Sequence, residues 1–537
     1  MLARCASAAL RGLEALPVSV EVDLAPGLPG LQLVGLADVA VQEARERVRA
    51  ALRNSGLRVP LTRIVVSLAP ADLRKAGPSF DLPIALGLLL ASGQLPPEQM
   101  RGVWSAGELG LDGGLRPVRG TLAIALAARR AGARALLVPS ANAAEAALAA
   151  GLRVWAAEDL AAALVVLRDP QRAVQPRSSP AAAPAAPPLD LDQVRGQQHG
   201  RRALEIAAAG GHHLLLVGPP GSGKTMLARR LAGLLPPLAQ EEALELTGLY
   251  SVAGLLAAGE GLRRQRPFRS PHHGCSAAAL IGGGAVPRPG ELSLAHHGVL
   301  FLDELGEFSR PLLDQLRQPL EEGRVWISRA RQQCSFPCRI TLVAATNPCP
   351  CGWDGDPERS CRCGEGQRRR YWGRLSGPLL DRLDLQVVMR RPAAAELAGV
   401  YRDRARRAAA VASGPAGSGP VAMAAAPESS ATVAARVQCA RQRMSRRNPG
   451  ACVNAQLSAE QLPAVLCLAP AALDLWEATL SRRGLSARAA QRLLRVALTI
   501  ADLAGHDRVE AAAIAEALSY RSFDLLEGEP QQAMTVA

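Results

Sequence analysis

The stretch GPPGSGKT, residues 218–225, decides the fold of the middle of this 537-residue chain. It matches G-x-x-x-x-G-K-[ST], a glycine-rich loop whose backbone N–H groups cradle phosphate oxygens. An apolar run of strand length, HLLLVG, precedes it, and KTMLARRLAGLL, with the composition of a helix, follows. This context predicts a buried parallel sheet with a nucleotide at a strand end. We therefore expect the chain to bind and hydrolyse ATP.

The lysines of the chain support this interpretation. Lys+Arg total 62, yet only Lys75 and Lys224 are lysines, so 60 are arginine. An ammonium on a flexible stem reaches phosphate oxygens as a compact charge, whereas a planar guanidinium has a different geometry. Thr225 would offer its hydroxyl to Mg²⁺. The predicted nucleotide-binding residues are Gly218, Pro219, Pro220, Gly221, Ser222, Gly223, Lys224 and Thr225.

Two further apolar runs end in polar residues that suit the same site. VLFLDE, residues 299–304, ends in Asp303 and Glu304, and TLVAATN, residues 341–347, ends in Asn347. Asp303 would hold Mg²⁺, mostly through water. Glu304 would orient and deprotonate the attacking water. Because ligands bind at the carboxyl ends of parallel strands, Asn347 could hold that water near the γ-phosphate.

The bulk composition indicates an anionic partner. The formal net charge is +14 and the sequence pI is about 9.9, which favours nucleic acid without excluding other anions. Aromatic residues make up only 3% of the chain, so contact through arginine and phosphate is expected rather than base stacking. No signal peptide or membrane-length apolar run is evident, and we expect a cytoplasmic protein whose eleven cysteines are thiols or metal ligands.

Two low-complexity stretches divide the chain into three blocks. A Pro/Ala linker is expected over 173–188 and a flexible Ala/Gly/Pro segment over 401–430. Block 1–172 reads as α/β, with strands over 18–24, 63–70 and 134–140 and one helix over 38–56, capped by Asp38 and ended by Gly56. Block 189–400 is the predicted ATPase core. Block 431–525 reads as helical throughout.

Long stretches of the sequence resemble the Mg-chelatase-like AAA+ ATPases of the ComM/YifB group, and the resemblance covers nearly the whole chain. The stretches are RPFRSPHHGCSAAALIGGG (266–284), PGELSLAHHGVLFLDEL (289–305), LRQPLEEGRVWISRA (316–330), AATNPCPCG (344–352) and LSGPLLDRLDL (375–385). The resemblance implies a P-loop AAA+ core with a C-terminal helical lid. The phosphate-loop residues and Asp303, Glu304 and Asn347 would then be its Walker A, Walker B and sensor-1 residues.

The resemblance also implies three arginine roles and an assembly. Arg382, in LLDRLDL, matches the arginine finger that reaches into a neighbouring subunit's site, with Arg374 as the second candidate. Arg488, in LSARAAQRLLR, matches the sensor-2 arginine of the lid. A finger supplied in trans implies a ring, and the family forms hexamers.

A charged hairpin is expected just before the Asn347 strand, over 323–340. In related AAA+ rings a hairpin at this place projects toward the central pore. Arg324, Arg329 and Arg331 could then contact a DNA backbone. A solvated charged hairpin with no such role is an equal alternative.

Four cysteines lie in CPCGWDGDPERSCRC. Cys349, Cys351, Cys361 and Cys363 could close one tetrahedral, structural Zn²⁺ site, although the C-x-C spacing departs from the usual C-x₂-C. Four free thiols are the alternative. His272 and His273 are a weaker metal candidate, for which a loop contact with nucleic acid or another subunit is favoured.

The N-terminal block resembles the Lon protease domain, a ribosomal-S5-like α/β fold, through DLRKAGPSFDLPIAL and GGLRPVRGTLAIALAARRAGARALLVPSAN. Ser79 falls at the position of that family's nucleophile, but Leu122 stands where its catalytic lysine would be. Leucine cannot accept the serine proton, so we expect a domain without protease activity. For Lys75 a backbone-capping or DNA-contact role is favoured over that of a replacement base.

Three functions remain open on the sequence. The favoured one is a ring-forming ATPase that moves on DNA, as ComM-like proteins do in branch migration during natural transformation. The second is a chelatase-type ATPase that remodels a protein partner. The sequence resembles the chelatase motor subunit only across the ATPase core and lid, which disfavours this second function. The third is a regulator or scaffold that uses ATP as a switch.

Overall fold

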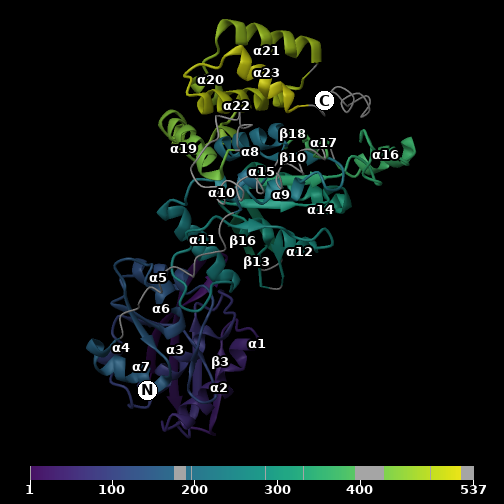
Figure 1. The fold of residues 1–537 in the computed structure, drawn as a ribbon. Helices are drawn as coiled ribbons and strands as arrows, with labels where there is room; N and C mark the ends of the chain where they lie inside the picture. Colours follow the sequence, from purple (N-terminus) through teal and green to yellow (C-terminus); the bar gives the residue numbers. More distant parts are fainter. Residues whose placement is uncertain are drawn as a thin grey trace, which may run out of the picture.

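The computed structural model describes residues 2–173, 189–194, 196–284, 286–329, 332–375, 377–392, 428–483 and 485–521 (Figure 1). The expected linker from 174 to 188, and residues 401–427 of the expected flexible segment, lie outside these ranges. Figure 1 shows the N-terminal block at one end, the phosphate-loop sheet in the middle and the C-terminal helices at the other end.

The N-terminal block is built on a seven-stranded mixed sheet in the order β3-β4-β2-β1-β5-β8-β9. The strands are β1 (Leu2–Arg11), β2 (Glu14–Ala25), β3 (Gly30–Val34), β4 (Arg63–Ala69), β5 (Val103–Ser105), β8 (Ala135–Pro139) and β9 (Arg153–Ala157). β1, β2 and β4 pair antiparallel, and the other ladders are parallel. In β4 buried residues alternate with more exposed ones, as expected for a strand with one face on the core.

Helices cover this sheet. They are α1 (Val39–Gln42), α2 (Ala44–Asn54), α3 (Asp81–Ala91), α4 (Pro97–Met100), α5 (Thr121–Arg130), α6 (Ala143–Ala146) and α7 (Leu160–Arg168), with the short strands β6 (Glu108–Leu109) and β7 (Leu115–Arg116). The helix predicted over 38–56 is divided at Glu43. Its ends are as predicted: the Asp38 side chain accepts from Val41 N, and Gly56 follows the last turn with φ 71°.

The ATPase core is a five-stranded parallel sheet in the order β11-β14-β17-β10-β18. Its strands are β11 (Phe268–Arg269), β14 (Val299–Leu302), β17 (Thr341–Thr346), β10 (Leu214–Val217) and β18 (Leu385–Val388). β10, β14 and β17 are buried at every position, which explains their unbroken apolar sequences. The helix predicted after the phosphate loop is two pieces, α9 (Lys224–Ala228) and α10 (Leu231–Leu234).

The other elements of this core are short, apart from two helices. They are α8 (Gln198–Gly210), α11 (Gln240–Ala253), α12 (Ala277–Leu280), β12 (Gly282–Gly283), β13 (Arg288–Pro289), α13 (Glu291–Leu294), α14 (Arg310–Asp314), α15 (Arg317–Glu322), β15 (Arg324–Arg329), β16 (Gln332–Pro337), α16 (Glu365–Trp372) and α17 (Gly377–Leu380). β15 and β16 pair antiparallel, so the predicted hairpin is present.

The C-terminal block is helical, as predicted. It contains α19 (Ser430–Arg447), α20 (Leu462–Val465), α21 (Pro470–Arg483), α22 (Ala487–Ala504) and α23 (Ala511–Ser519). Its apolar residues share one core with β10, β18 and α8. Across the ranges the structure describes, no helix has the length and apolar character needed to cross a membrane.

A buried polar contact joins the N-terminal block to the ATPase core. The Glu145 carboxylate accepts from the Leu122 backbone N–H at 2.7 Å and from the Ser251 hydroxyl at the end of α11. Gly120 N also donates to the Ser251 carbonyl at 3.2 Å. Burial raises the pKa of Glu145, and these hydrogen bonds oppose the rise. Helices α5 and α11 lie side by side at this contact (Figure 1).

Candidate nucleotide site

The sheet order places three strand ends next to one another. β17 lies between β10 and β14, so Asn347 at its end stands between the phosphate loop after β10 and Asp303 after β14. Because all three strands are parallel, their polar ends lie at one edge of the sheet. The structure thus brings Lys224, Thr225, Asp303 and Asn347 together.

The Lys224 ammonium has three acceptors, one for each of its protons. Nζ donates to the Gly218 carbonyl at 2.6 Å, the Pro219 carbonyl at 3.0 Å and Asn347 Oδ1 at 3.2 Å. Burial lowers the pKa of Lys224 to about 8, while the charges of Asp303 and Glu304 act in the opposite direction. A phosphate oxygen in this loop would supply the anionic partner that a half-buried ammonium favours.

Thr225 and Asp303 offer the oxygen ligands that Mg²⁺ prefers. The Thr225 hydroxyl donates to Asp303 Oδ2 at 2.8 Å, and Asp303 Oδ1 accepts from the Glu304 backbone N–H at 3.0 Å. One hydroxyl and one carboxylate next to a phosphate cradle are a donor set that fits a magnesium ion carried by ATP.

Glu304 has a strained backbone and an exposed side chain. Its φ is 54° and its ψ is 49°, the left-handed conformation that non-glycine residues rarely adopt. Such strain costs about 1–3 kcal/mol and is concentrated at functional sites. The His273 ring lies against this carboxylate, with Nδ1 3.2 Å from Glu304 Oε2. The sequence did not assign His273 to the site, because nothing in residues 266–284 indicates that it meets Glu304.

The three predicted arginines lie outside this hydrogen-bonded group. Arg382 pairs with Glu321 and donates to the Pro378 carbonyl at 2.5 Å. Arg374 donates to the Gly306 carbonyl at 3.0 Å and lies 3.4 Å from Glu307 Oε2. Arg488 is exposed in the first turn of α22. Among the described residues, no hydrogen bond joins any of them to Lys224 or Asp303, so their roles stay predictions.

Among the side chains that the structure describes in the β15–β16 hairpin, Arg324 and Trp326 are an exposed cation and an exposed aromatic ring. Arg324, at its base, is exposed, and Trp326 has 52% of its surface accessible. Trp326 Nε1 donates to Glu322 Oε2 at 3.1 Å. Arg329 ends β15, and Arg331 falls outside the described residues. The exposed Trp326 was not expected, because aromatic residues make up only 3% of the chain.

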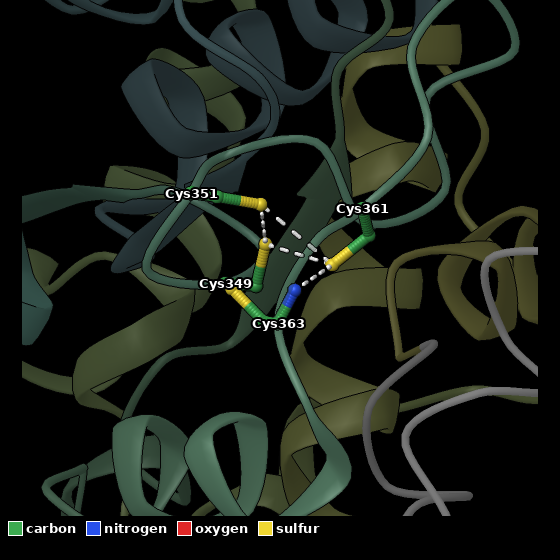
Figure 2. Close-up of side chains that lie close together, drawn as sticks. All are labelled: Cys349, Cys351, Cys361 and Cys363. Carbon is green, nitrogen blue, oxygen red and sulfur yellow. Dashed lines mark hydrogen bonds between the residues drawn. The ribbon is translucent and has the colours of Figure 1, made fainter.

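The four clustered cysteines converge on one point (Figure 2). The Sγ–Sγ distances are 3.3 Å for Cys349–Cys351, 3.6 Å for Cys349–Cys361 and 3.7 Å for Cys351–Cys361. The sulfur of Cys363 completes a group whose four Sγ atoms all lie within 4.8 Å of one another. The four cysteines that could share one Zn²⁺ site therefore do lie together.

The protease-like positions hold no catalytic pair. Leu122 is buried in α5, and a Cβ built on Gly248 of α11 would lie 3.9 Å from its Cδ2. Lys75 is buried and its Nζ donates to the Pro70 carbonyl, which is the backbone-capping role favoured above. This burial favours the capping role, and the DNA-contact alternative for Lys75 stays a prediction. Ser79 contributes its carbonyl to Gly107 N at 3.0 Å.

Comparisons with known proteins agree with this architecture. Family models described as "Magnesium chelatase, subunit ChlI", "Subunit ChlI of Mg-chelatase" and "Magnesium chelatase, subunit ChlI C-terminal" match residues 190–397, 20–142 and 427–521. The chelatase likeness therefore also reaches the N-terminal block, which the sequence interpretation had left outside it.

Two relatives match almost the whole chain, and a third matches part of it. The uncharacterized protein YifB of Escherichia coli is 44% identical over 526 residues, 98% of each chain. The competence protein ComM of Haemophilus influenzae is 42% identical over 524 residues, 96% of each chain. Lon protease 2 of Bacillus subtilis is 28% identical over 149 residues, 27% of each chain.

Proposed function

The chain belongs to the Mg-chelatase-like AAA+ ATPases that include YifB and ComM, and from that premise we propose that it is an ATP-driven motor on DNA. In this proposal it forms a hexameric ring and promotes branch migration during recombination of incoming DNA. The N-terminal Lon-like block would have no protease activity.

Each residue at this edge of the sheet would have its own role in ATP hydrolysis. Lys224 would neutralise the β- and γ-phosphates, and Thr225 and Asp303 would hold Mg²⁺, which spreads the charge of the leaving phosphates. Glu304 would take a proton from the attacking water while Asn347 orients that water. Arg382 would approach the γ-phosphate of a neighbouring subunit once it leaves Glu321. Arg488, as the sensor-2 arginine, would approach the γ-phosphate from the helical lid.

The observation that carries the DNA part is the hairpin between α15 and β17. It exposes Arg324 beside Trp326, a cation for phosphate and a ring for a base. Arg329 and Arg331 are the remaining predicted phosphate contacts. The strand after the hairpin is β17, and Asn347 follows its last residue, Thr346, so a load on the hairpin would act on the water-positioning residue. The net charge of +14 and the full-length likeness to a competence protein support the same partner.

Trp326 provides a specific prediction. Trp326→Ala should weaken binding of single-stranded DNA by about 1–3 kcal/mol, the usual contribution of one stacked base, with basal ATP hydrolysis unchanged. Fluorescence anisotropy of a labelled oligonucleotide measures the affinity. Trp326→Phe, which keeps an aromatic ring at the same position, is the matched control. Equal DNA affinity in wild type and Trp326→Ala would remove the stacking role.

Strand exchange tests the motor itself. Wild-type protein should move the branch point of a labelled three-way junction in the presence of ATP, and Lys224→Ala should not. The chelatase-type alternative, remodelling of a protein partner, is favoured by the three chelatase models that match this chain. A protein with ATPase activity but without DNA stimulation or branch movement would shift the assignment to that alternative or to an ATP-switched regulator.

A further inference from the structure

The four sulfur atoms of Cys349, Cys351, Cys361 and Cys363 have the spacing of a tetrahedral metal site (Figure 2). Zn²⁺ binds thiolate sulfur at about 2.3 Å, so the sulfurs of a regular tetrahedron lie about 3.8 Å apart. Three pairs here lie at 3.3, 3.6 and 3.7 Å. A shift of a few tenths of an ångström would place all three around one ion.

The surroundings of the sulfurs suit a thiolate site. The Cys363 backbone N–H donates to Cys361 Sγ at 3.4 Å, the kind of hydrogen bond that orients a metal-binding thiolate. Four thiolates around Zn²⁺ carry a net charge of −2, and Arg368 of α16 interacts with Cys361. Arg368 also pairs with Asp354 of the same loop at 3.0 Å. The excess negative charge therefore has a cation beside it.

Other thiol chemistry fits these distances less well. A disulfide needs two sulfurs about 2.05 Å apart. The three pairs at 3.3, 3.6 and 3.7 Å are wider than that, and all four cysteines are free thiols. An iron–sulfur cluster places iron and inorganic sulfide between the cysteine ligands, so their sulfurs lie farther apart than in a single-ion site. Four thiolates leave no open position for substrate, which is the pattern of a structural zinc ion.

The loop that carries these sulfurs contacts the nucleotide site directly. Asn347 lies two residues before Cys349. Gly352, with φ 83°, packs so closely on the phosphate loop that a Cβ there would lie 2.7 Å from Pro220 Cδ and 3.9 Å from Asn347 Cγ. Any side chain larger than glycine would push the loop away from Pro220.

Helix α16, which follows Cys363, holds the other side of Asn347. Tyr371 Oη and Thr346 Oγ1 are 2.9 Å apart, and Trp372 Nε1 donates to the Pro348 carbonyl at 2.9 Å. Thr346 and Pro348, the residues on either side of Asn347, are therefore hydrogen-bonded to α16. An ion shared by Cys349, Cys351, Cys361 and Cys363 would fix α16 to the start of the loop and so fix Asn347 between them.

We propose that these four cysteines bind one Zn²⁺ per chain and that the site positions Asn347 and Pro220 for ATP. Each thiol releases its proton to solvent as its sulfur binds the ion. The positioning part rests on the proposed ATPase site, whereas the metal site itself does not. The cysteines act through Asn347 and are positioning residues.

Metal content tests the site without reference to activity. Full-length protein, purified under reducing conditions without chelator, should contain about one zinc per chain by plasma mass spectrometry. Cys361→Ser/Cys363→Ser should lose it, and Cys439→Ser/Cys467→Ser, at two exposed cysteines elsewhere, should retain it. Protein with Co²⁺ in place of zinc should show the visible absorption of a tetrahedral thiolate site. Zinc near zero, iron in its place, or zinc retained in Cys361→Ser/Cys363→Ser would overturn the metal site.

Nucleotide binding tests the positioning role. Wild-type protein stripped of zinc should bind a fluorescent ATP analogue about 10- to 100-fold more weakly, because a small misplacement of binding residues has an effect of this size. Added zinc should restore the affinity. This reversible arm does not depend on whether the double variant folds. Unchanged affinity after zinc removal would overturn positioning while leaving the metal site intact. Normal zinc and zinc-dependent nucleotide binding without hydrolysis would instead count against the proposed function alone.

Discussion

Nucleotide binding should be accompanied by proton uptake at Lys224. Burial lowers the pKa of this ammonium to about 8, so about a tenth of the side chains are neutral at pH 7, half at pH 8 and nine tenths at pH 9. Bound phosphates favour the charged form and should return the pKa toward its ordinary value of about 10.4. Binding should then take up about 0.1, 0.5 and 0.9 proton at pH 7, 8 and 9.

Calorimetry measures this uptake. A non-hydrolysable ATP analogue is titrated in buffers that differ in ionisation enthalpy, and the slope of observed enthalpy against ionisation enthalpy gives the protons taken up. The terminal phosphate, whose pKa is about 6, is about nine tenths ionised at pH 7 and almost fully ionised at pH 8 and 9, so the uptake at pH 8 and 9 carries the test. Lys224→Arg is the matched variant, because a guanidinium stays charged at all three pH values.

The result that would refute this reasoning is an uptake that stays flat from pH 7 to pH 9. It would mean either that Lys224 is fully charged before binding or that it does not meet the phosphates. An uptake that persists in Lys224→Arg would assign the proton to another group. In the structure, Lys224 Nζ donates to Gly218, Pro219 and Asn347. Either outcome would contradict the inference that nucleotide binding replaces these contacts with contacts to phosphate.

Three further variants test other parts of the molecule. Glu304→Gln should bind ATP normally and hydrolyse it about 10²- to 10⁴-fold more slowly, since the base is lost; a normal single-turnover rate would show that Glu304 is not the base. Arg382→Ala should lose about 10³-fold or more in hydrolysis and recover activity when mixed with Lys224→Ala subunits, whose Arg382 is intact; no recovery at any ratio would argue against a finger in trans. Glu145→Gln should flatten the pH dependence of unfolding. The raised pKa of Glu145 means that the folded protein holds more protons between the usual and the raised value, so stability falls as pH rises through that window. Equal slopes of melting temperature against pH in the two proteins would refute that assignment.

Most of the ATPase core could be predicted because its signals are local. The glycines of residues 218–225 and the acids after residues 299–302 are fixed by the chemistry of phosphate and Mg²⁺, and the apolar runs before them are of strand length. Helix boundaries were less accurate. Residues 38–56 form two helices, and so do residues 224–235, because tertiary packing determines where a periodic sequence turns.

What the sequence could not predict depends on contacts between distant segments. His273 meets Glu304 across a loop, and Glu145 meets Ser251 across two blocks of the chain. Gly352 packs on Pro220 only because the cysteine loop folds back over the phosphate loop. Neither the sequence spacing nor the local composition indicates that the members of these pairs lie in contact. The convergence of the four cysteines was one of two alternatives that the sequence offered, and the structure does bring the four sulfurs together.

The steady-state ATPase rate with and without single-stranded and branched DNA tests the central claim most directly, with Lys224→Ala as the blank. We expect strong stimulation by DNA that fades as salt rises, because phosphate contacts release bound counterions. Hydrolysis by wild-type protein at the same rate with and without DNA, at low salt, would contradict a DNA motor.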